Sequence, residues 1–204
     1  ARKLRLSTGR PLTGAYFTSG AEPRPHIHAI SRMAISAARA GHRAYIFAQQ
    51  HGRLAREILR ECPAAGIEVQ RIQGGEIDNS LSAPILLLEH ATRREENALT
   101  ARYFPQFDFL VSPAHERTNW ALGLGLPMFI LEPCFGTFAP LNREILLRHR
   151  VAHVLDHTFA RQSLGTQLDS MRSTGQLTQM AEHGWGRYPI NGFDTIAALL
   201  GRPL

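Results

Sequence analysis

Apolar and polar residues follow two different rhythms along this chain. Continuous apolar runs at 84–90, 107–113 and 127–133 are typical of strands that are buried on both faces of a sheet. Between such runs, apolar residues recur at helical spacing, as Ile27, Ile30 and Ala34 do within 26–41. The pattern predicts strands at 12–20, 42–50, 67–72, 84–90, 107–113, 127–133 and 151–156, and helices at 26–41, 52–62, 94–104, 117–125, 142–150, 163–173 and 192–201.

The order of these elements predicts the fold class. Strand and helix alternate about six times, which favours an α/β fold with a parallel sheet. Right-handed crossovers place helices on both faces, so we expect a doubly wound, mostly parallel sheet of about six strands. The 204 residues suit one globular domain, which we place at 12–204. The basic, polar segment 1–11 is expected to be a linker or a cut end.

The composition argues against several function classes. Of the 23 basic residues, Lys3 is a lysine and the other 22 are arginines. No internal lysine can form a Schiff base and no G-K-[ST] motif occurs, so pyridoxal-phosphate and P-loop chemistry are not expected. The formal net charge of +6 is compatible with attraction to an anionic lipid surface, although codon usage explains the arginine excess equally well.

Cysteines and aromatic residues bear on location and partners. Cys62 and Cys134 stand alone without metal-ligand spacing, which indicates a reducing compartment and not a disulfide framework. No apolar run is long enough to span a membrane. We therefore expect a cytoplasmic protein, with peripheral binding at the inner membrane surface as an addition. Aromatic residues are not interleaved with basic runs, so no nucleic-acid partner is expected.

In doubly wound sheets, ligands bind at the carboxyl ends of the strands, so the loops that follow the predicted strands are the candidate site. The first such loop contains Ser19, Gly20 and Ala21 and leads into a predicted helix. A glycine lets a ligand approach the backbone closely, and the free N–H groups at a helix start attract anions. This loop is a candidate phosphate site, and an ordinary strand–helix turn is the simpler alternative.

The loop after the strand at 107–113 carries many hydrogen-bonding side chains between two apolar elements. Glu116 can accept hydrogen bonds from sugar hydroxyls, Arg117 can pair with a phosphate, and Thr118 or Asn119 can cap the following helix. The alternative is a simple cap beside a solvated ion pair. The candidate residues here are Ser112, His115, Glu116, Arg117, Thr118 and Asn119.

One asparagine and two groups of histidines complete the candidates. Asn142 follows the loop after the strand at 127–133 and opens a predicted helix, either as a ligand residue or as a cap. His26 and His28 are spaced so that a helix places them on different faces. The predicted strand at 151–156 interrupts the spacing of His149, His153 and His157. We therefore expect no metal site and no cofactor.

From about residue 85 onward, the order of motifs resembles the C-terminal half of the GT-B glycosyltransferases. A buried strand with D-x-x-V at 108–111 leads to a polar loop, and the next helix ends in G-x-P at 125–127. An apolar strand, a loop and Asn142 follow, and 150–152 is similar to the family's G-V-A strand. The tail resembles the family's closing helices. The resemblance covers roughly 12–204 and is closest to the undecaprenyl N-acetylglucosaminyltransferase and diacylglycerol glycosyltransferase group.

The resemblance implies a Rossmann-like domain that binds a nucleotide sugar, with a UDP-sugar as one candidate. It would be half of a two-domain enzyme, in which an N-terminal domain or a partner subunit binds the acceptor and supplies the catalytic base. It places the donor phosphate at Ser19, Gly20 and Ala21 and the nucleotide base near His90 and Ala91. Backbone amides, and not a metal ion, would stabilise the leaving diphosphate.

Three hypotheses about function follow. The first is the donor-binding half of a glycosyltransferase that transfers a hexose-type sugar to an unknown acceptor and is inactive as an isolated domain. The second is half of a nucleotide-sugar epimerase or hydrolase of the same fold. The third is a non-catalytic binding domain, which is favoured by Trp120 and Ala139 at positions where the family has Glu and Gln. A nucleoside-diphosphate binding assay separates the third hypothesis from the other two.

Overall fold

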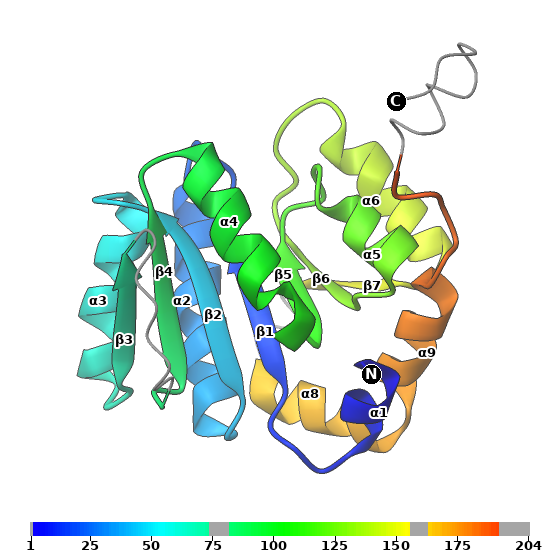
Figure 1. Ribbon diagram of the computed structural model, residues 1–204, viewed down its shortest axis with the longest axis horizontal. Coiled ribbons are helices and arrows are strands. Elements are labelled where there is room, and N and C mark those ends of the chain that lie inside the picture. Colours follow the sequence, from blue (N-terminus) through cyan, green and yellow to red (C-terminus); the bar gives the residue numbers. More distant parts are fainter. Residues whose placement is uncertain (1, 74–81, 156–162, 192–204) are drawn as a thin grey trace.

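The computed structural model describes residues 2–73, 82–155 and 163–191, which fold around a seven-stranded parallel sheet. The strand order is β3-β4-β2-β1-β5-β6-β7 (Figure 1). This confirms the predicted α/β, Rossmann-like class, with one strand more than the six expected. The strands are β1 (Thr13–Phe17), β2 (Arg43–Gln49), β3 (Val69–Gln73), β4 (Ile85–His90), β5 (Phe109–Ser112), β6 (Met128–Leu131) and β7 (Ala152–Leu155).

Helices cover both faces of the sheet (Figure 1). One face carries α1 (Arg2–Ser7), α2 (Arg24–Arg39), α3 (Arg53–Ala64), α8 (Leu164–Ser173) and α9 (Gln176–Gly184). The other face carries α4 (Arg93–Tyr103), α5 (Thr118–Leu124) and α6 (Ala139–Arg148). None of the described helices is long and apolar enough to cross a membrane.

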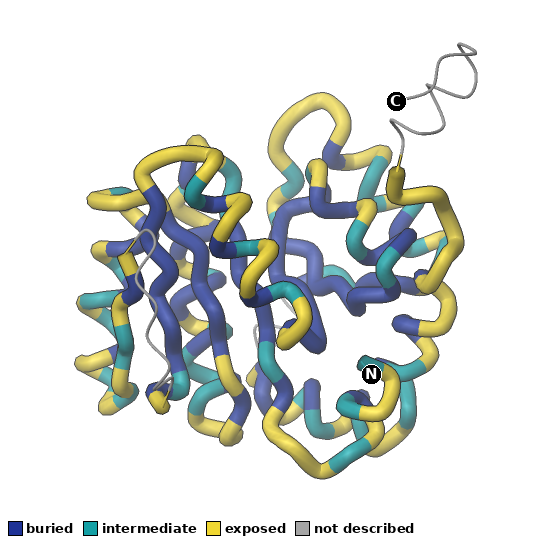
Figure 2. The backbone as a smooth tube through the Cα atoms, viewed as in Figure 1, coloured by how far each residue is buried: buried dark blue, intermediate teal, exposed yellow. Residues whose placement is uncertain are grey.

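Two apolar cores form because successive strand residues point to opposite faces. In β1, Tyr16 packs into the core under α2 and α3, whereas Phe17 packs into the core under α4 and α5. In β2, Ile46 and Phe47 divide between the two cores in the same way. The central strands are consequently buried along their length (Figure 2). This explains why their sequences are continuous apolar runs.

The order in which the chain adds strands to the sheet changes direction between β1 and β5. Strands β2, β4 and β3 lie on one side of β1, and β5, β6 and β7 lie on the other. Strands β1 and β5 are neighbours, with Gly14 paired to Phe109 and Tyr16 paired to Val111. The helix that follows β1 covers one face of the sheet, and the helix that follows β5 covers the other. The loops at their carboxyl ends therefore diverge, and such a switch point is where doubly wound sheets bind ligands.

Several helix limits differ from the prediction. Helix α6 begins at Ala139 and not at Asn142, because Pro140 suits a first helical turn, where a missing N–H costs nothing. Pro63 does not stop α3, which continues to Ala64. The helix expected at 192–201 lies outside the described residues, as does His157.

The segment 1–11, which the sequence predicts to be a linker or a cut end, contains helix α1 packed against the domain. Leu6 is fully buried in the core. Arg2 donates hydrogen bonds to the carbonyl groups of Phe107 and Leu124. Arg5 Nε donates to Asp108 Oδ1 at 2.6 Å, and Asp108 also accepts from the Thr13 N–H. Asp108 of the D-x-x-V motif thus holds the start of the domain, at the end of the sheet away from the switch point.

Candidate functional site

A cavity of about 240 Å³ lies at the carboxyl ends of β1, β2, β4 and β5. Seven of the residues predicted from the sequence line it, and they come from three loops that are far apart in the chain. These are Ser19, Gly20, His90, Ala91, His115, Glu116 and Arg117. The sheet topology brings the three loops together because it places β1 between β2 and β5.

The loop after β1 forms a tight turn at the edge of this cavity. The N–H of Glu22 donates to the carbonyl of Ser19 at 2.9 Å. Among the described residues, nothing accepts a hydrogen bond from the N–H of Gly20 or Ala21. The side chain of Ala21 does not line the cavity, and its carbonyl accepts a hydrogen bond from Arg53. Two backbone donors in this turn are therefore available to an anion.

Glu22 is a buried carboxylate that the sequence analysis did not select. Its Oε2 accepts from the N–H of Arg53 at 2.5 Å and so caps α3. Gly52 makes room for this contact, because a Cβ there would lie 2.7 Å from Glu22 Oε1. Oε1 is buried and has no hydrogen-bond partner among the described residues. Glu22 therefore lines the cavity mainly as the residue that fixes the start of α3 beside it.

Four charged side chains form a network on the opposite wall. Arg117 donates through Nη2 to Glu96 Oε1, and both side chains are only 9% exposed. Arg93 bridges Glu96 Oε2 at 3.0 Å and Glu116 Oε1 at 3.2 Å. The guanidinium of Arg117 also lies 3.9 Å from the centre of the Phe17 ring, a cation–π contact. The wall is thus held by paired charges, and Arg117 is engaged by protein atoms.

Burial and neighbouring charges shift the pKa values of the ionisable groups that line the cavity. Burial lowers the pKa of Arg117, and Glu96 and Glu116 oppose that change. The pKa of Glu116 is also lowered, because its hydrogen bonds and the charges of Arg117 and Arg93 outweigh its burial. Burial lowers the pKa of His90. At neutral pH the cavity therefore presents a Glu116 carboxylate and a neutral His90 imidazole.

The loop after β4 uses part of its hydrogen-bonding capacity to start α4. Thr92 Oγ1 accepts from the N–H of Glu95 at 3.2 Å, and Glu95 Oε2 accepts from the N–H of Ala91 at 2.7 Å. This pair is a variant of the capping box, because Glu95 accepts from the residue before the N-cap Thr92; the T-x-x-E signature is visible in the sequence. The backbone N–H of Ala91 is therefore occupied, and His90 is the lining residue here with a polar side chain that can turn to a ligand.

Four further predicted residues, in addition to Ala21, do not line the cavity. Neither Thr118 nor Asn119 caps α5: Arg117 occupies the cap position, and Asn119 is exposed in the first turn. Thr118 Oγ1 donates to the carbonyl of His115, and Ser112 Oγ donates to the carbonyl of Pro113. Asn142 does not open α6, but its Nδ2 donates to the carbonyl of Ala114 at 3.0 Å. It holds the loop after β5 in place from behind.

Histidines attach the loop after β6 to this site. His115 Nε2 lies 2.9 Å from the carbonyl of Phe135, and buried His26 Nε2 lies 2.9 Å from the carbonyl of Pro133. Since a carbonyl only accepts, both nitrogens carry hydrogen. His28 points instead to Glu57. Within 2–73, 82–155 and 163–191, no group of three or more His, Cys, Asp or Glu side chains could hold a metal ion.

Several site residues that the sequence did not reveal contact partners that are far away along the chain. Glu96 lies 21 positions before its partner Arg117, and Glu22 lies 31 positions before Arg53. Phe17 and Phe47 stack with ring centres 4.2 Å apart because their strands are paired. The missed lining residues are Phe17, Thr18, Glu22, Phe47, Gln49, Thr92, Arg93, Glu96 and Pro113.

Comparison with known proteins identifies the fold. No protein-family model matches the sequence, and no curated protein is a close sequence match. The S. aureus protein MnaA, in a co-structure with UDP, superposes with a TM-score of 0.55 at 9% identity and covers 100% of this chain. A putative UDP-N-acetylglucosamine 2-epimerase from Listeria monocytogenes gives 0.56 at 11% identity and covers 97%. The chain spans about half of those proteins, at 51% and 45% of their lengths.

Proposed function

We propose that this chain is a nucleotide-sugar-binding domain whose cavity takes the nucleoside diphosphate part of a UDP-sugar. The observation that carries the proposal is the cavity at the switch point, which is lined by Gly20 with its unpaired backbone N–H, adjoins the unpaired N–H of Ala21, and is faced by the ionised carboxylate of Glu116. Support comes from the fold neighbours, one of which is a UDP co-structure and the other a putative UDP-N-acetylglucosamine 2-epimerase.

Each part of such a ligand has a counterpart in the cavity. The N–H groups of Gly20 and Ala21 would receive the diphosphate. The Glu116 carboxylate would accept hydrogen bonds from ribose or sugar hydroxyls, and neutral His90 would lie near the base. The same backbone amides would stabilise the nucleoside diphosphate as it leaves, so no metal ion is required in this scheme.

The size of the cavity supports a site completed by a second domain. Its volume of about 240 Å³ is below the roughly 300–1,000 Å³ of usual ligand pockets. It would therefore enclose part of a nucleotide sugar and leave the reacting sugar in the opening. We propose that an N-terminal domain or a partner subunit closes this opening, binds the acceptor and supplies the catalytic base.

For the reaction we propose transfer of a hexose-type sugar to an acceptor, as the motif order from residue 85 onward implies. Epimerisation of the sugar nucleotide is the second candidate, because one fold neighbour is a putative UDP-N-acetylglucosamine 2-epimerase. In either reaction, the proposed role of this domain is to hold the nucleoside diphosphate part of the substrate. Product analysis of a two-domain enzyme separates them, since epimerisation needs no acceptor.

Calorimetric titration with UDP, GDP, TDP and ADP tests the binding proposal. We expect saturable binding of UDP that a chelator such as EDTA does not change. Failure of all four nucleotides to bind would contradict a nucleotide site in this domain. A requirement for a divalent metal would contradict the amide-based scheme while leaving the nucleotide site intact.

A substitution in the cavity tests the placement of the ligand. Glu116→Ala removes an acceptor that a hydroxyl-to-carboxylate hydrogen bond would use, so we expect UDP-sugar affinity to fall about tenfold or more. Glu144→Ala is the matched control, because Glu144 is also an exposed carboxylate paired with an arginine but lies on α6. Equal affinity in the two variants would remove Glu116 from the ligand site.

A further inference from the structure

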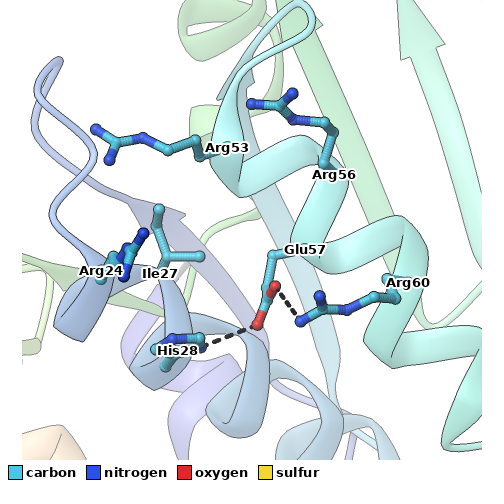
Figure 3. A pocket seen from close by; sticks show the side chains of 7 residues that line it. All are labelled: Arg24, Ile27, His28, Arg53, Arg56, Glu57 and Arg60. Carbon is cyan, nitrogen blue, oxygen red and sulfur yellow. Dashed lines mark hydrogen bonds and ion pairs between the residues drawn. The ribbon is translucent and has the colours of Figure 1, made fainter.

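A second concave surface lies between α2 and α3, outside the cavity at the switch point. It encloses about 430 Å³, and most of its lining is charged. Arg24 and His28 come from α2, and Arg53, Arg56, Glu57 and Arg60 come from α3 (Figure 3). We call it the α2–α3 groove. Four arginines here face one carboxylate, so the lining carries a net positive charge.

The carboxylate of the groove is already neutralised. Glu57 Oε1 lies 2.9 Å from His28 Nδ1, and Glu57 Oε2 accepts from Arg60 Nη2 at 2.6 Å (Figure 3). Arg60 also pairs with Glu61 at 2.9 Å. These contacts satisfy one end of the groove. They leave Glu57 with no oxygen directed at the arginines of the other end.

The other end of the groove holds arginines without anionic partners. The side chains of Arg24 and Arg56 make no hydrogen bond or ion pair with the described part of the chain. Arg53 uses one Nη2 to donate to the carbonyl of Ala21 at 2.5 Å, which carries no full charge. Figure 3 shows Arg53 reaching from the start of α3 over the start of α2, where Arg24 lies. The positive ends of both helix dipoles add to this potential.

We propose that the α2–α3 groove is a second ligand site, which binds a phosphate-bearing small molecule. Guanidinium groups form paired, charge-assisted hydrogen bonds to phosphate oxygens, and three of them gather at one end of this groove. An anion there removes the repulsion among them. A concave surface fits a discrete phosphate group better than a flat membrane, and Ile27 is the one apolar residue of the lining.

The groove and the cavity lie on opposite sides of the loop after β1. Arg53 lines the groove, while its backbone N–H is held by Glu22 and its guanidinium by the Ala21 carbonyl. Glu22 and the preceding Gly20 line the cavity. A ligand held by Arg53 would therefore sit next to the turn that presents the Gly20 and Ala21 amides. We therefore propose that the phosphate-bearing molecule is a second substrate or an effector. This proposal does not rest on the identity of the ligand that binds in the cavity.

Calorimetric titration with inorganic pyrophosphate at low ionic strength tests this site. The test variant is R24Q/R56Q, which removes the two unpaired arginines. The matched control is R10Q/R94Q, because Arg10 and Arg94 are also exposed and without ion pairs but lie away from the groove. We expect pyrophosphate affinity to fall about tenfold in the test variant and to stay unchanged in the control, since charge-assisted bonds are the stronger kind. UDP affinity should be unchanged in both.

Three outcomes would overturn the proposal. Wild-type protein that does not bind pyrophosphate has no such site, and equal loss in the two variants would mean that only overall charge is sensed. Binding to phosphatidylglycerol vesicles that R24Q/R56Q abolishes, without binding of pyrophosphate, would assign the groove to a membrane surface instead. If the wild-type protein does not bind UDP, only the proposed nucleotide function is contradicted. The test of the groove is unaffected, because it compares pyrophosphate affinities and does not use UDP.

Discussion

The cavity at the switch point and the α2–α3 groove both contain arginines, but they hold them in opposite ways. In the cavity, Arg117 is buried and paired with Glu96, and Arg93 contacts the same carboxylate. In the groove, Arg24 and Arg56 are exposed and have no ion pair with the described residues. A buried charge needs a partner because losing water costs several kcal/mol, whereas water solvates an exposed one.

The difference shows which arginines are available to a ligand. Arg117 donates through Nη2 to Glu96 and through Nη1 to Glu116, and its guanidinium lies over the ring of Phe17. Its Nε is buried without a partner among the described residues, so Arg117 acts mainly as part of the wall. In the groove, the side chains of Arg24 and Arg56 have no partner among the described residues and keep their donors free for an outside anion. A high arginine content therefore does not by itself identify an anion site. An arginine is available to an anion only where no carboxylate of the protein lies close enough to pair with it.

The strongest test of this comparison is to break the buried pair. Glu96→Ala leaves the Arg117 guanidinium buried without its carboxylate, and we expect a loss of about 3–5 kcal/mol in the free energy of unfolding. Urea denaturation measures it. The control is Arg93→Gln, whose side chain is 60% exposed and should cost about 1 kcal/mol or less. Similar small losses in both variants would mean that burial does not enforce the pairing.

A smaller effect is expected from His26, which lies on the cavity side of α2, whereas His28 lies on the groove side. Burial lowers the pKa of His26, so the unfolded chain binds its proton more readily than the folded chain. The stability that depends on neutral His26 is present above about pH 6.5 and is lost as the pH falls below it, by about 1.4 kcal/mol for each unit of pKa difference.

His26→Gln keeps a donor for the Pro133 carbonyl but cannot be protonated. It loses the edge contact with Phe135, so we expect it to be less stable than the wild type at pH 8. The gap in unfolding free energy should narrow as the pH falls from 8 to 5.5. A constant gap over that range would show that His26 does not contribute to the acid sensitivity.

The smallest effect is expected from the groove itself. R24Q/R56Q removes two exposed charges that have no partner in the described structure, so the unfolding free energy should change by no more than about 0.5 kcal/mol. Any change should be a gain at low salt, because repulsion is relieved, and should vanish in 1 M salt. A loss above 1 kcal/mol would show that these arginines stabilise the fold and are not free.

Much of the fold and part of the site could be predicted because they depend on local spacing. The continuous run at 84–90 became buried β4, and the helical spacing within 26–41 became α2. The rule that ligands bind at carboxyl ends of strands selected Ser19, His90 and Glu116, which line one cavity. Pro140 could have corrected the start of α6, since proline is common in the first helical turn.

The remaining residues could not be selected from local spacing. Asn142 was expected to open a helix beside a ligand, and instead it holds the carbonyl of Ala114, 28 positions earlier. Segment 1–11 was expected to be a linker or a cut end; within it, Arg5 contacts Asp108 more than a hundred positions away and Leu6 is buried. No pattern within a short window encodes such partners.

The sequence by itself determined the α/β class, the position of most strands and helices, and the loops that could carry a ligand. It did so because periods of 2 and 3.6 residues decide which side chains are buried. The tertiary structure alone decided which charges are paired and which are free. Strand order brings Glu96 to Arg117 and Glu22 to the start of α3, while Arg24 and Arg56 line the α2–α3 groove without an ion pair among the described residues. Pairing depends on distance in space, and chain order does not specify that distance.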